Sequence, residues 1–397
     1  MTYIYIELHS YNPHNEVNID KTKNIWETRI LEEFKLAERL FNLPETKGTF
    51  QLRGIVEGCH SNDFYTEDTT SNGNDRRTLK FAVNTSKDNK VPCKLTAYTK
   101  NEVYFFKNAS KKGEKGTTKK VSWDERFENQ GEGYSLIGMN VGLVKVEDES
   151  HKGRMVNLKK RLTEFDAAKY VSEHLEDGQS VFIKGNMEYG SFLNEKNGNK
   201  IVFSRMTPSQ ISLCSEEVNF DDPEYEMISD FVQTIVVTSI EKEVIDDKPT
   251  GRTLVLAKIV GYSTIEDAEF YVEDNKLATV LSRNVKPYNS ITVMGNITSK
   301  VEKEEVEDDD CWGSQNSMTK VKSPTKKELI IVGAKPSTLD KTTYTREAIE
   351  EALEKIKKSQ EAKRDFGESE ENDNGDFSES EWGNVKGFES MSEDEGW

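Results

Sequence analysis

The 397-residue sequence has few cysteines, and they are scattered along the chain. The four lie at positions 59, 93, 214 and 311, and no two of them form a C-x-x-C pair. This pattern argues against a disulfide framework or a zinc site and favours a reduced cytoplasm. No apolar run approaches the roughly 18 residues of a membrane span. The opening segment, "MTYIYIELHSYNPHNEVN", lacks the basic and apolar regions of a signal peptide, so we expect neither secretion nor a membrane partner.

Recognisable catalytic motifs are also missing. The five histidines show neither H-E-x-x-H nor H-x3-H spacing. The segment "KGEKGTTKK" (112–120) contains two glycines, but no G-K-[ST] follows them, so it does not form a P-loop. There is no G-x-S-x-G elbow, and the acidic "EDDD" (307–310) is contiguous, which favours a solvated loop over an ion site. We therefore expect a protein without enzymatic activity, cofactor or metal.

The charge of the chain is unevenly distributed. The formal net charge is −18, and 32% of the residues are charged. Between Arg76 and Arg161, however, twenty basic residues face ten acidic ones, a local excess of +10. From Asp365 to Trp397, twelve acidic residues and one lysine leave −11. The basic region indicates a polyanionic partner, with a solvated lysine-rich loop as the alternative. The acidic tail has little to bury and is predicted to be disordered.

The sequence contains an internal repeat. "HLEDGQSVFIKGNM" (174–187) aligns without a gap with "NVKPYNSITVMGNI" (284–297), which places Gly185 on Gly295. Upstream, "RTLKFAV" (77–83) matches "RTLVLAK" (252–258). Each copy reads as strand, strand, helix, strand with a glycine, and strand, which indicates two copies of one domain. The first copy carries a long basic insertion, and the second has a longer, acidic last hairpin.

The order of these elements predicts a mainly β fold with two five-stranded OB barrels in tandem, flanked by helices. The N-terminal extension should contain an amphipathic helix at 24–43, and a C-terminal helix is expected at 345–363. The expected parts are an extension at 1–47, a first barrel at 48–220 with its insertion at about 99–160, a second barrel at 228–340, a helical segment at 341–364 and a disordered acidic tail at 365–397.

The second copy resembles a known family of OB-fold proteins. "AEFYVEDNKLATVLSRNVKPYNSITVMGNI" is similar to the strand–helix–strand segment of single-stranded DNA-binding proteins. The closing "SMSEDEGW" resembles the acidic tails, ending in an aromatic residue, of their bacterial and phage members, although the last residue here is tryptophan rather than phenylalanine. The resemblance covers roughly 48–215, 228–340 and the last ten residues. It implies a phage-type protein of the host cytoplasm that coats single-stranded DNA during replication, recombination and repair.

The basic insertion supplies the residue types that single-strand binding requires. Phosphates need a positive groove, and bases stack on aromatic faces. Strand alternation in "VPCKLTAYT" places Lys94 and Tyr98 on the outer face of the first barrel. Tyr98, Trp123 and Phe127 are the preferred stacking rings, with Tyr104 and Phe106 next, and packing within the loop is the alternative for each. The remaining candidates are Lys94, Lys100, Lys107, Lys111, Lys112, Lys115, Lys119, Lys120 and Arg126.

The second barrel and the tail supply fewer candidates. In the second barrel these are Arg252, Tyr271, Arg283 and Trp312, and Trp312 suits either base stacking or a protein contact. A terminal ring beside a free carboxylate suits an apolar, Lys/Arg-rimmed pocket on a polymerase, helicase or primase. The tail residues expected to bind such a partner are Glu393, Asp394, Glu395 and Trp397. An OB-fold adaptor that binds proteins and an RNA-binding OB protein are the alternative interpretations.

Overall fold

The computed structural model describes residues 40–71, 73–109, 116–128, 130–148, 151–193, 200–245, 247–300, 303–306, 318–321 and 326–365. The fold is mainly β, as the sequence predicts. Most of the predicted helix at 24–43 and nearly all of the predicted acidic tail lie outside these residues. Trp312 and the insertion lysines at 111, 112 and 115 lie outside them as well.

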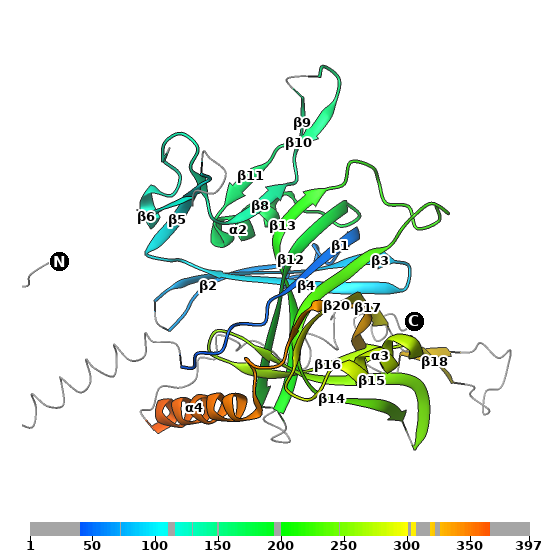
Figure 1. Cartoon of the computed structure of the whole chain (residues 1–397). Helices are drawn as coiled ribbons and strands as arrows, with labels where there is room; N and C mark the ends of the chain where they lie inside the picture. The colour runs from blue at the N-terminus through cyan, green and yellow to red at the C-terminus, as the bar shows by residue number, and fades with distance from the viewer. Residues whose placement is uncertain are drawn as a thin grey trace, which may run out of the picture.

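The first five-stranded circuit is built from long strands whose inward residues alternate with outward ones. Its members are β1 (Gly48–Glu57), β3 (Asp75–Ser86), β4 (Asn89–Tyr98), β12 (Ser180–Leu193) and β13 (Lys200–Leu213). β1 pairs with β3 and β12, β3 with β4, and β12 with β13, all antiparallel. A parallel contact between β13 and β4 closes the circuit, which gives an OB barrel (Figure 1).

The second circuit repeats this connectivity. Its strands are β14 (Ile228–Ile245), β15 (Lys248–Val260), β16 (Ile265–Val272), β17 (Ser290–Lys300) and β20 (Lys326–Asp340). β14 pairs with β15 and β17, β15 with β16, and β17 with β20, and β16 meets β20 in parallel. In each circuit a helix joins the third and fourth strands, α2 (Glu164–His174) in the first and α3 (Asn275–Asn284) in the second. The side chains of Thr163 and Asp274 cap these two helices.

The two barrels share a sheet. β1 also pairs antiparallel with β14, and Phe50 lies opposite Phe231 in that pairing. Phe50 faces Gly185 in its own barrel, and Phe231 faces Gly295 in the other, so the two phenylalanines occupy equivalent positions. An approximate two-fold axis therefore passes through the β1–β14 pairing, between Phe50 and Phe231, and relates the two copies.

The structure confirms one repeat match and corrects the other. Gly185 and Gly295 are equivalent, and each lies at a shift in strand register where a side chain would collide with a backbone carbonyl. The match of "RTLKFAV" with "RTLVLAK", in contrast, is wrong by one residue. Leu79 is buried in the first barrel, whereas Leu254 points outward and Val255 is the buried residue. A one-residue slip reverses the two faces of a strand, so the shared letters do not mark equivalent side chains.

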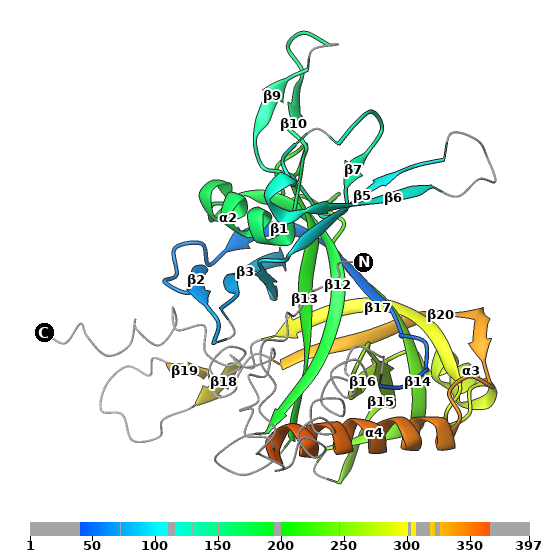
Figure 2. The same ribbon diagram turned by 90° about the vertical axis from the view of Figure 1, so that its left-hand side faces the viewer.

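The basic insertion joins β4 to α2 as a set of short elements (Figure 2). They are β5 (Glu102–Lys107), β6 (Thr117–Ser122), the short 3-10 helix η1 (Trp123–Glu125), β7 (Ser135–Leu136), β8 (Met139–Gly142), β9 (Lys145–Glu147), β10 (Met155–Asn157) and β11 (Lys160–Leu162). β8 pairs with β13 and buries Met139 and Val141 in the barrel core, which anchors the insertion. The β5–β6 and β9–β10 hairpins project from the same end of the molecule (Figures 1 and 2).

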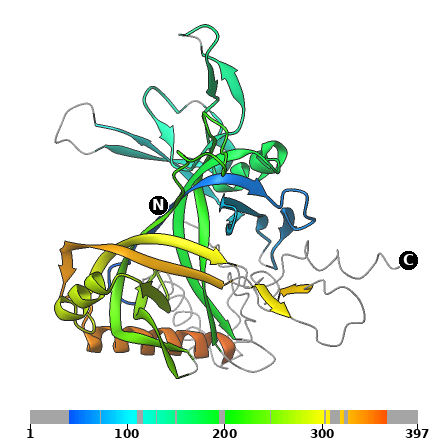
Figure 3. The ribbon, with the colours of Figure 1, turned by 90° about the vertical axis from the view of Figure 1, so that its right-hand side faces the viewer.

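The remaining elements lie around the barrels. β2 (Tyr65–Thr69) extends β3, and β18 (Lys303–Val306) pairs with β19 (Met318–Val321). The helix α4 (Arg346–Asp365) lies at the end opposite the insertion (Figure 3) and packs Ile349 and Ala352 against Phe41 and Leu43. None of the helices in the described part of the chain is long and apolar enough to cross a membrane.

Candidate nucleic-acid interface

The small sheet β6–β5–β7 has one buried face and one exposed aromatic face. Val103 and Phe105 alternate with Tyr104 and Phe106 along β5 and pack with Val121 and Leu136 in a separate small core. On the opposite face, the exposed fractions are 46% for Tyr104, 38% for Phe106 and 56% for Ile137. Tyr104, Phe106 and Ile137 are called the aromatic face below. Alternation along a strand therefore leaves two rings open to solvent side by side.

Lysines surround this sheet. Lys120 lies directly opposite Tyr104 and pairs with Glu102, whose hydrogen bond raises the pKa of Lys120. On the other side of the sheet, Lys119 Nζ donates to Gln130 Oε1 at 2.9 Å. Lys107 Nζ donates to the Glu132 carbonyl at 2.9 Å. The predicted combination of rings and lysines is thus present on a sheet that projects from the barrel.

Arg126 fastens this sheet to α2. Its Nε and Nη2 atoms donate to the two carboxylate oxygens of Asp166 at 2.8 and 3.2 Å. The guanidinium carbon lies 4.3 Å from the ring centroids of both Trp123 and Phe127. Trp123 meets Phe165 edge-on at 6.0 Å. Arg126 and Trp123 are therefore engaged within the protein, while Phe127, which also contacts the guanidinium, is 67% exposed.

A second basic surface lies on the β9–β10 hairpin and β11. Its exposed cations, called the basic hairpin below, are Lys145, Lys152, Arg154, Lys159, Lys160 and Arg161. Lys160 lies 4.3 Å from the Tyr170 ring, which stacks on His174 at 4.0 Å. These residues were not among the sequence candidates, although the run "KKR" at 159–161 is a local signal for them. The fold brings this run to the same end of the molecule as the aromatic face (Figures 1 and 2).

The candidates on the barrel itself are more enclosed. Lys94 is 8% exposed, and Tyr98 is half-buried opposite Arg76 on β3. Arg76 pairs with Asp68 at 2.8 Å. Lys100 Nζ lies 3.1 Å from a carboxylate oxygen of Glu164. Lys94 and Tyr98 thus have less open surface than the aromatic face, whereas Lys100 is exposed.

Two of the second-barrel candidates, Arg252 and Tyr271, are in contact, but both are engaged within the protein. Arg252 is held by Glu243 and Glu328 at 2.8 Å each, and these hydrogen bonds raise the pKa of Arg252. Its guanidinium covers Tyr271, which is buried. Arg283 is exposed in the last turn of α3. The predicted tail residues, 393–395 and 397, lie outside the described residues.

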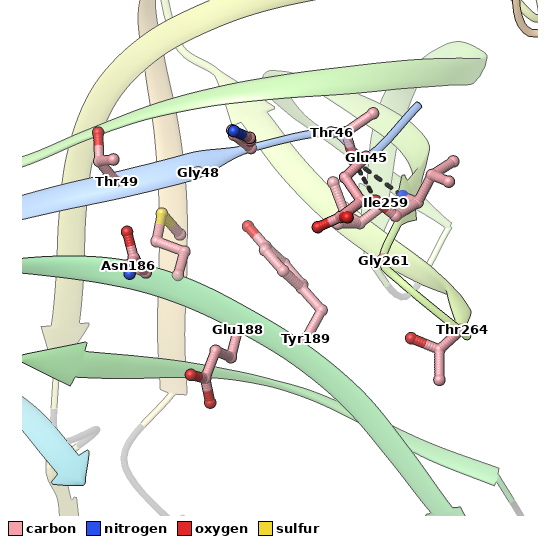
Figure 4. Close-up of a pocket in the computed structure, with 13 residues that line it drawn as sticks. Glu45, Thr46, Gly48, Thr49, Asn186, Glu188, Tyr189, Ile259, Gly261 and Thr264 are labelled. Atoms are coloured by element: carbon pink, nitrogen blue, oxygen red, sulfur yellow. Dashed lines mark hydrogen bonds between the residues drawn. The ribbon is translucent and has the colours of Figure 1, made fainter. Parts of the chain in front are cut away.

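A pocket of 460 Å³ lies where the barrels meet, between the start of β1, β12 and the β15–β16 turn (Figure 4). Thr46 holds the wall, because its Oγ1 accepts a hydrogen bond from the Val260 amide at 2.8 Å. The Tyr189 ring points from β12 toward the strand that carries Gly48. Its hydroxyl is buried without a hydrogen-bond partner, and burial raises the pKa of Tyr189. Among the described residues, no group of His, Cys, Asp and Glu suited to a metal occurs here or elsewhere.

Comparisons with known proteins gave two kinds of match. The sequence model of the YorF family matches residues 107–369. A deletion mutant of the single-stranded DNA binding protein from Thermus aquaticus has a TM-score of 0.34 and 12% identity, covering 73% of this chain and 94% of that chain. The wild-type Thermus aquaticus protein has a TM-score of 0.34 and 11% identity, covering 74% and 93%. No curated protein sequence matches this chain.

Proposed function

The chain belongs to the YorF family, a name that carries no activity, and we propose from its interface that it binds single-stranded DNA without sequence preference. The observation that carries this proposal is the aromatic face, with two exposed rings on a projecting sheet bordered by lysines. Stacking on such rings is worth roughly 1–3 kcal/mol per base and tolerates any base. The basic hairpin adds six exposed cations for the phosphates.

The geometry favours single strands over duplex. A flat aromatic face can stack only on bases that are unstacked from their neighbours, and a duplex presents phosphates and base edges instead. Duplex contacts would therefore use the basic hairpin but not Tyr104 or Phe106. We propose that the protein coats single-stranded DNA in phage replication, recombination and repair. We also propose that its acidic tail recruits replication proteins through Glu393, Asp394, Glu395 and Trp397.

The test is fluorescence anisotropy with labelled oligo(dT), oligo(rU) and duplex, each titrated at two salt concentrations. Tyr104→Ala combined with Phe106→Ala should weaken oligo(dT) binding at least tenfold, since about 1.4 kcal/mol corresponds to a factor of ten. Duplex binding should change little. The control is Tyr262→Ala, which removes a 61% exposed ring from the second barrel.

Equal oligo(dT) affinity in the double variant and the wild type would contradict the proposed interface. Tighter binding of oligo(rU) than of oligo(dT) would instead favour the RNA-binding alternative. Because Tyr104 and Phe106 lie outside the small core, their loss should not unfold the sheet, and thermal unfolding of each variant checks this point.

A further inference from the structure

The outer face of β15 and β16 in the second barrel differs in chemistry from the equivalent face of β3 and β4 in the first barrel. The Val56–Val83 pair of the first barrel is equivalent to the Val237–Ala257 pair of the second. Three residues before these positions, the first barrel has Lys80, and Lys94 lies opposite it. The second barrel has Leu254 opposite Tyr271 at the same place. Two cations of the first barrel are therefore replaced by apolar and aromatic side chains.

Acidic residues dominate this face of the second barrel. It carries Glu241, Glu243, Asp267, Glu269 and Glu328. The two cations among the described side chains of this face are both held by these carboxylates, because Arg252 binds Glu243 and Glu328, and Lys258 Nζ lies 2.6 Å from Asp267. For these described side chains, five carboxylates against two cations leave a formal charge of −3. Such a face repels the phosphate chain of a nucleic acid.

The same face presents apolar surface. Leu254 and Leu256 are half-buried on β15, and within the described residues neither belongs to a hydrophobic cluster or packs against one. Leu256 lies between Ser239 and the exposed Glu269, and Leu254 lies beside the exposed Glu241. We infer that this face, called the acidic face below, docks a protein segment in which lysine or arginine flanks apolar side chains. The leucines would receive the apolar residues, and the carboxylates would pair with the cations.

The probe is a synthetic amphipathic peptide of about fourteen residues, with leucines every three or four positions and lysines beside them. A carbodiimide joins a lysine amine of the peptide to a carboxylate in contact with it, with loss of water, and mass spectrometry locates the amide. In the full chain, cross-links are expected at Glu241, Asp267 and Glu269. A matched peptide with serine in place of leucine should give at least tenfold less product there.

Variants of the acidic face provide the second measurement. Leu254→Ser with Leu256→Ser, and separately Glu241→Lys with Glu269→Lys, should each weaken peptide binding at least tenfold by anisotropy. The control is Glu216→Lys with Glu217→Lys, which makes the same charge change at two exposed residues between the barrels. The tail is the same in all these proteins, so its attraction for a basic peptide does not affect the comparison.

Three outcomes would overturn the inference. Cross-links confined to residues 366–397 would place the peptide on the tail alone. Equal peptide affinity in all variants would show that the acidic face is not used. Loss of oligo(dT) binding in the Glu241→Lys, Glu269→Lys variant would make the face a nucleic-acid surface, whereas the inference requires unchanged or tighter binding. Failure of the single-strand proposal, measured at Tyr104 and Phe106, would leave the first two outcomes unaffected, because they depend on the peptide alone.

Discussion

At the scale of single residues, Gly185 shows why both repeats keep a glycine in the fourth strand. A Cβ at this position would lie 2.0 Å from the Thr207 carbonyl oxygen and 2.6 Å from Cε1 of Phe50. Gly295 meets the equivalent Ile330 carbonyl and Phe231 ring at 1.8 and 2.9 Å. Backbone oxygens cannot move aside as a flexible side chain can, so the strand itself would have to shift.

We expect Gly185→Ala to lower the free energy of unfolding by about 1–3 kcal/mol, the usual cost of overpacking. The measurement is the urea midpoint of the full chain at constant slope. The control is Gly333→Ala, where the nearest atom to the new Cβ is the flexible Met294 side chain at 3.3 Å. A Gly185→Ala variant as stable as the control would contradict this explanation of the glycine that the two repeats share.

Lys327 is a second residue with a testable role in stability. It lies between the barrels, donates to the Ser204 carbonyl, and burial lowers the pKa of Lys327 to about 7 from an ordinary value of 10.5. The folded state therefore binds a proton more weakly than the unfolded state. The contribution of Lys327 therefore lowers the free energy of unfolding most below pH 7, and this loss is recovered as the pH rises toward 10.5.

Lys327→Met should therefore raise the free energy of unfolding at pH 6.5 by about 1 kcal/mol. It should also flatten the increase in stability between pH 7 and pH 10. Urea unfolding at a series of pH values measures both effects. Lys335→Met, an exposed change on the same strand, is the control and should keep the wild-type slope. A variant slope equal to that of the wild type would show that Lys327 does not titrate in this range.

The residue scale also shows what strand alternation can and cannot predict. Alternation in "VPCKLTAYT" puts Val91, Cys93, Leu95 and Ala97 on the face opposite Lys94 and Tyr98, and all four are buried in the core. Alternation could not show that Arg126 forms an ion pair with Asp166, because that partner lies 40 residues further along the chain. The sequence does not reveal the role of Trp123 either, because its edge contact, Phe165, also lies far along the chain.

At the scale of elements, one ion pair joins the segment that follows β6 to α2, in addition to the anchoring of the insertion by β8. Asp166 binds Arg126 and also completes the cap of α2, since Thr163 Oγ1 accepts from its amide and donates to its carboxylate. The Arg126 guanidinium in turn lies against two rings, those of Trp123 in η1 and of Phe127. The sequence predicted the composition of the insertion, but its strand pairings and its attachment to α2 are tertiary and leave no periodic signal.

The Asp166→Ala variant distinguishes two roles of Asp166: positioning the aromatic face through Arg126, and acting only as a negative charge near the DNA. Removing an acid near a phosphate-binding surface should by charge alone strengthen oligo(dT) binding. If Asp166 positions the aromatic face through Arg126, the affinity should instead fall about threefold to tenfold, with faster hydrogen exchange in β5 and β6. Glu164→Gln, which removes a neighbouring acid paired with Lys100, is the charge control and should bind equally or more tightly. Tighter binding by both variants would reject the positioning role.

At the scale of the whole molecule, the two repeats of the chain pair with each other through β1 and β14, as the two subunits of a dimer would. The sequence indicated two copies of one domain, and the strand circuits agree with that interpretation. It gave no sign that β1 and β14 would pair, because each strand alone reads as an ordinary alternating segment. Because β1 and β14 pair, a barrel with a basic insertion is joined to a barrel with an acidic face in one sheet.

Asn89 tests whether the two barrels unfold together. Its buried amide donates to the Ile297 carbonyl at 3.0 Å, and its Oδ1 accepts from the Ser299 amide at 2.7 Å, both in the second barrel. Asn89→Ala would leave the buried Ser299 amide without this acceptor, at a cost of about 1–3 kcal/mol. Because the β1–β14 ladder also couples the barrels, we expect calorimetry to show one transition in wild type and variant, shifted to lower temperature in the variant.

The control is Ser86→Ala, which removes a half-buried hydroxyl from the same β3–β4 hairpin and should shift the transition far less. Two resolved transitions, with only one of them moved by Asn89→Ala, would show that the barrels are independent folding units joined by a weak interface.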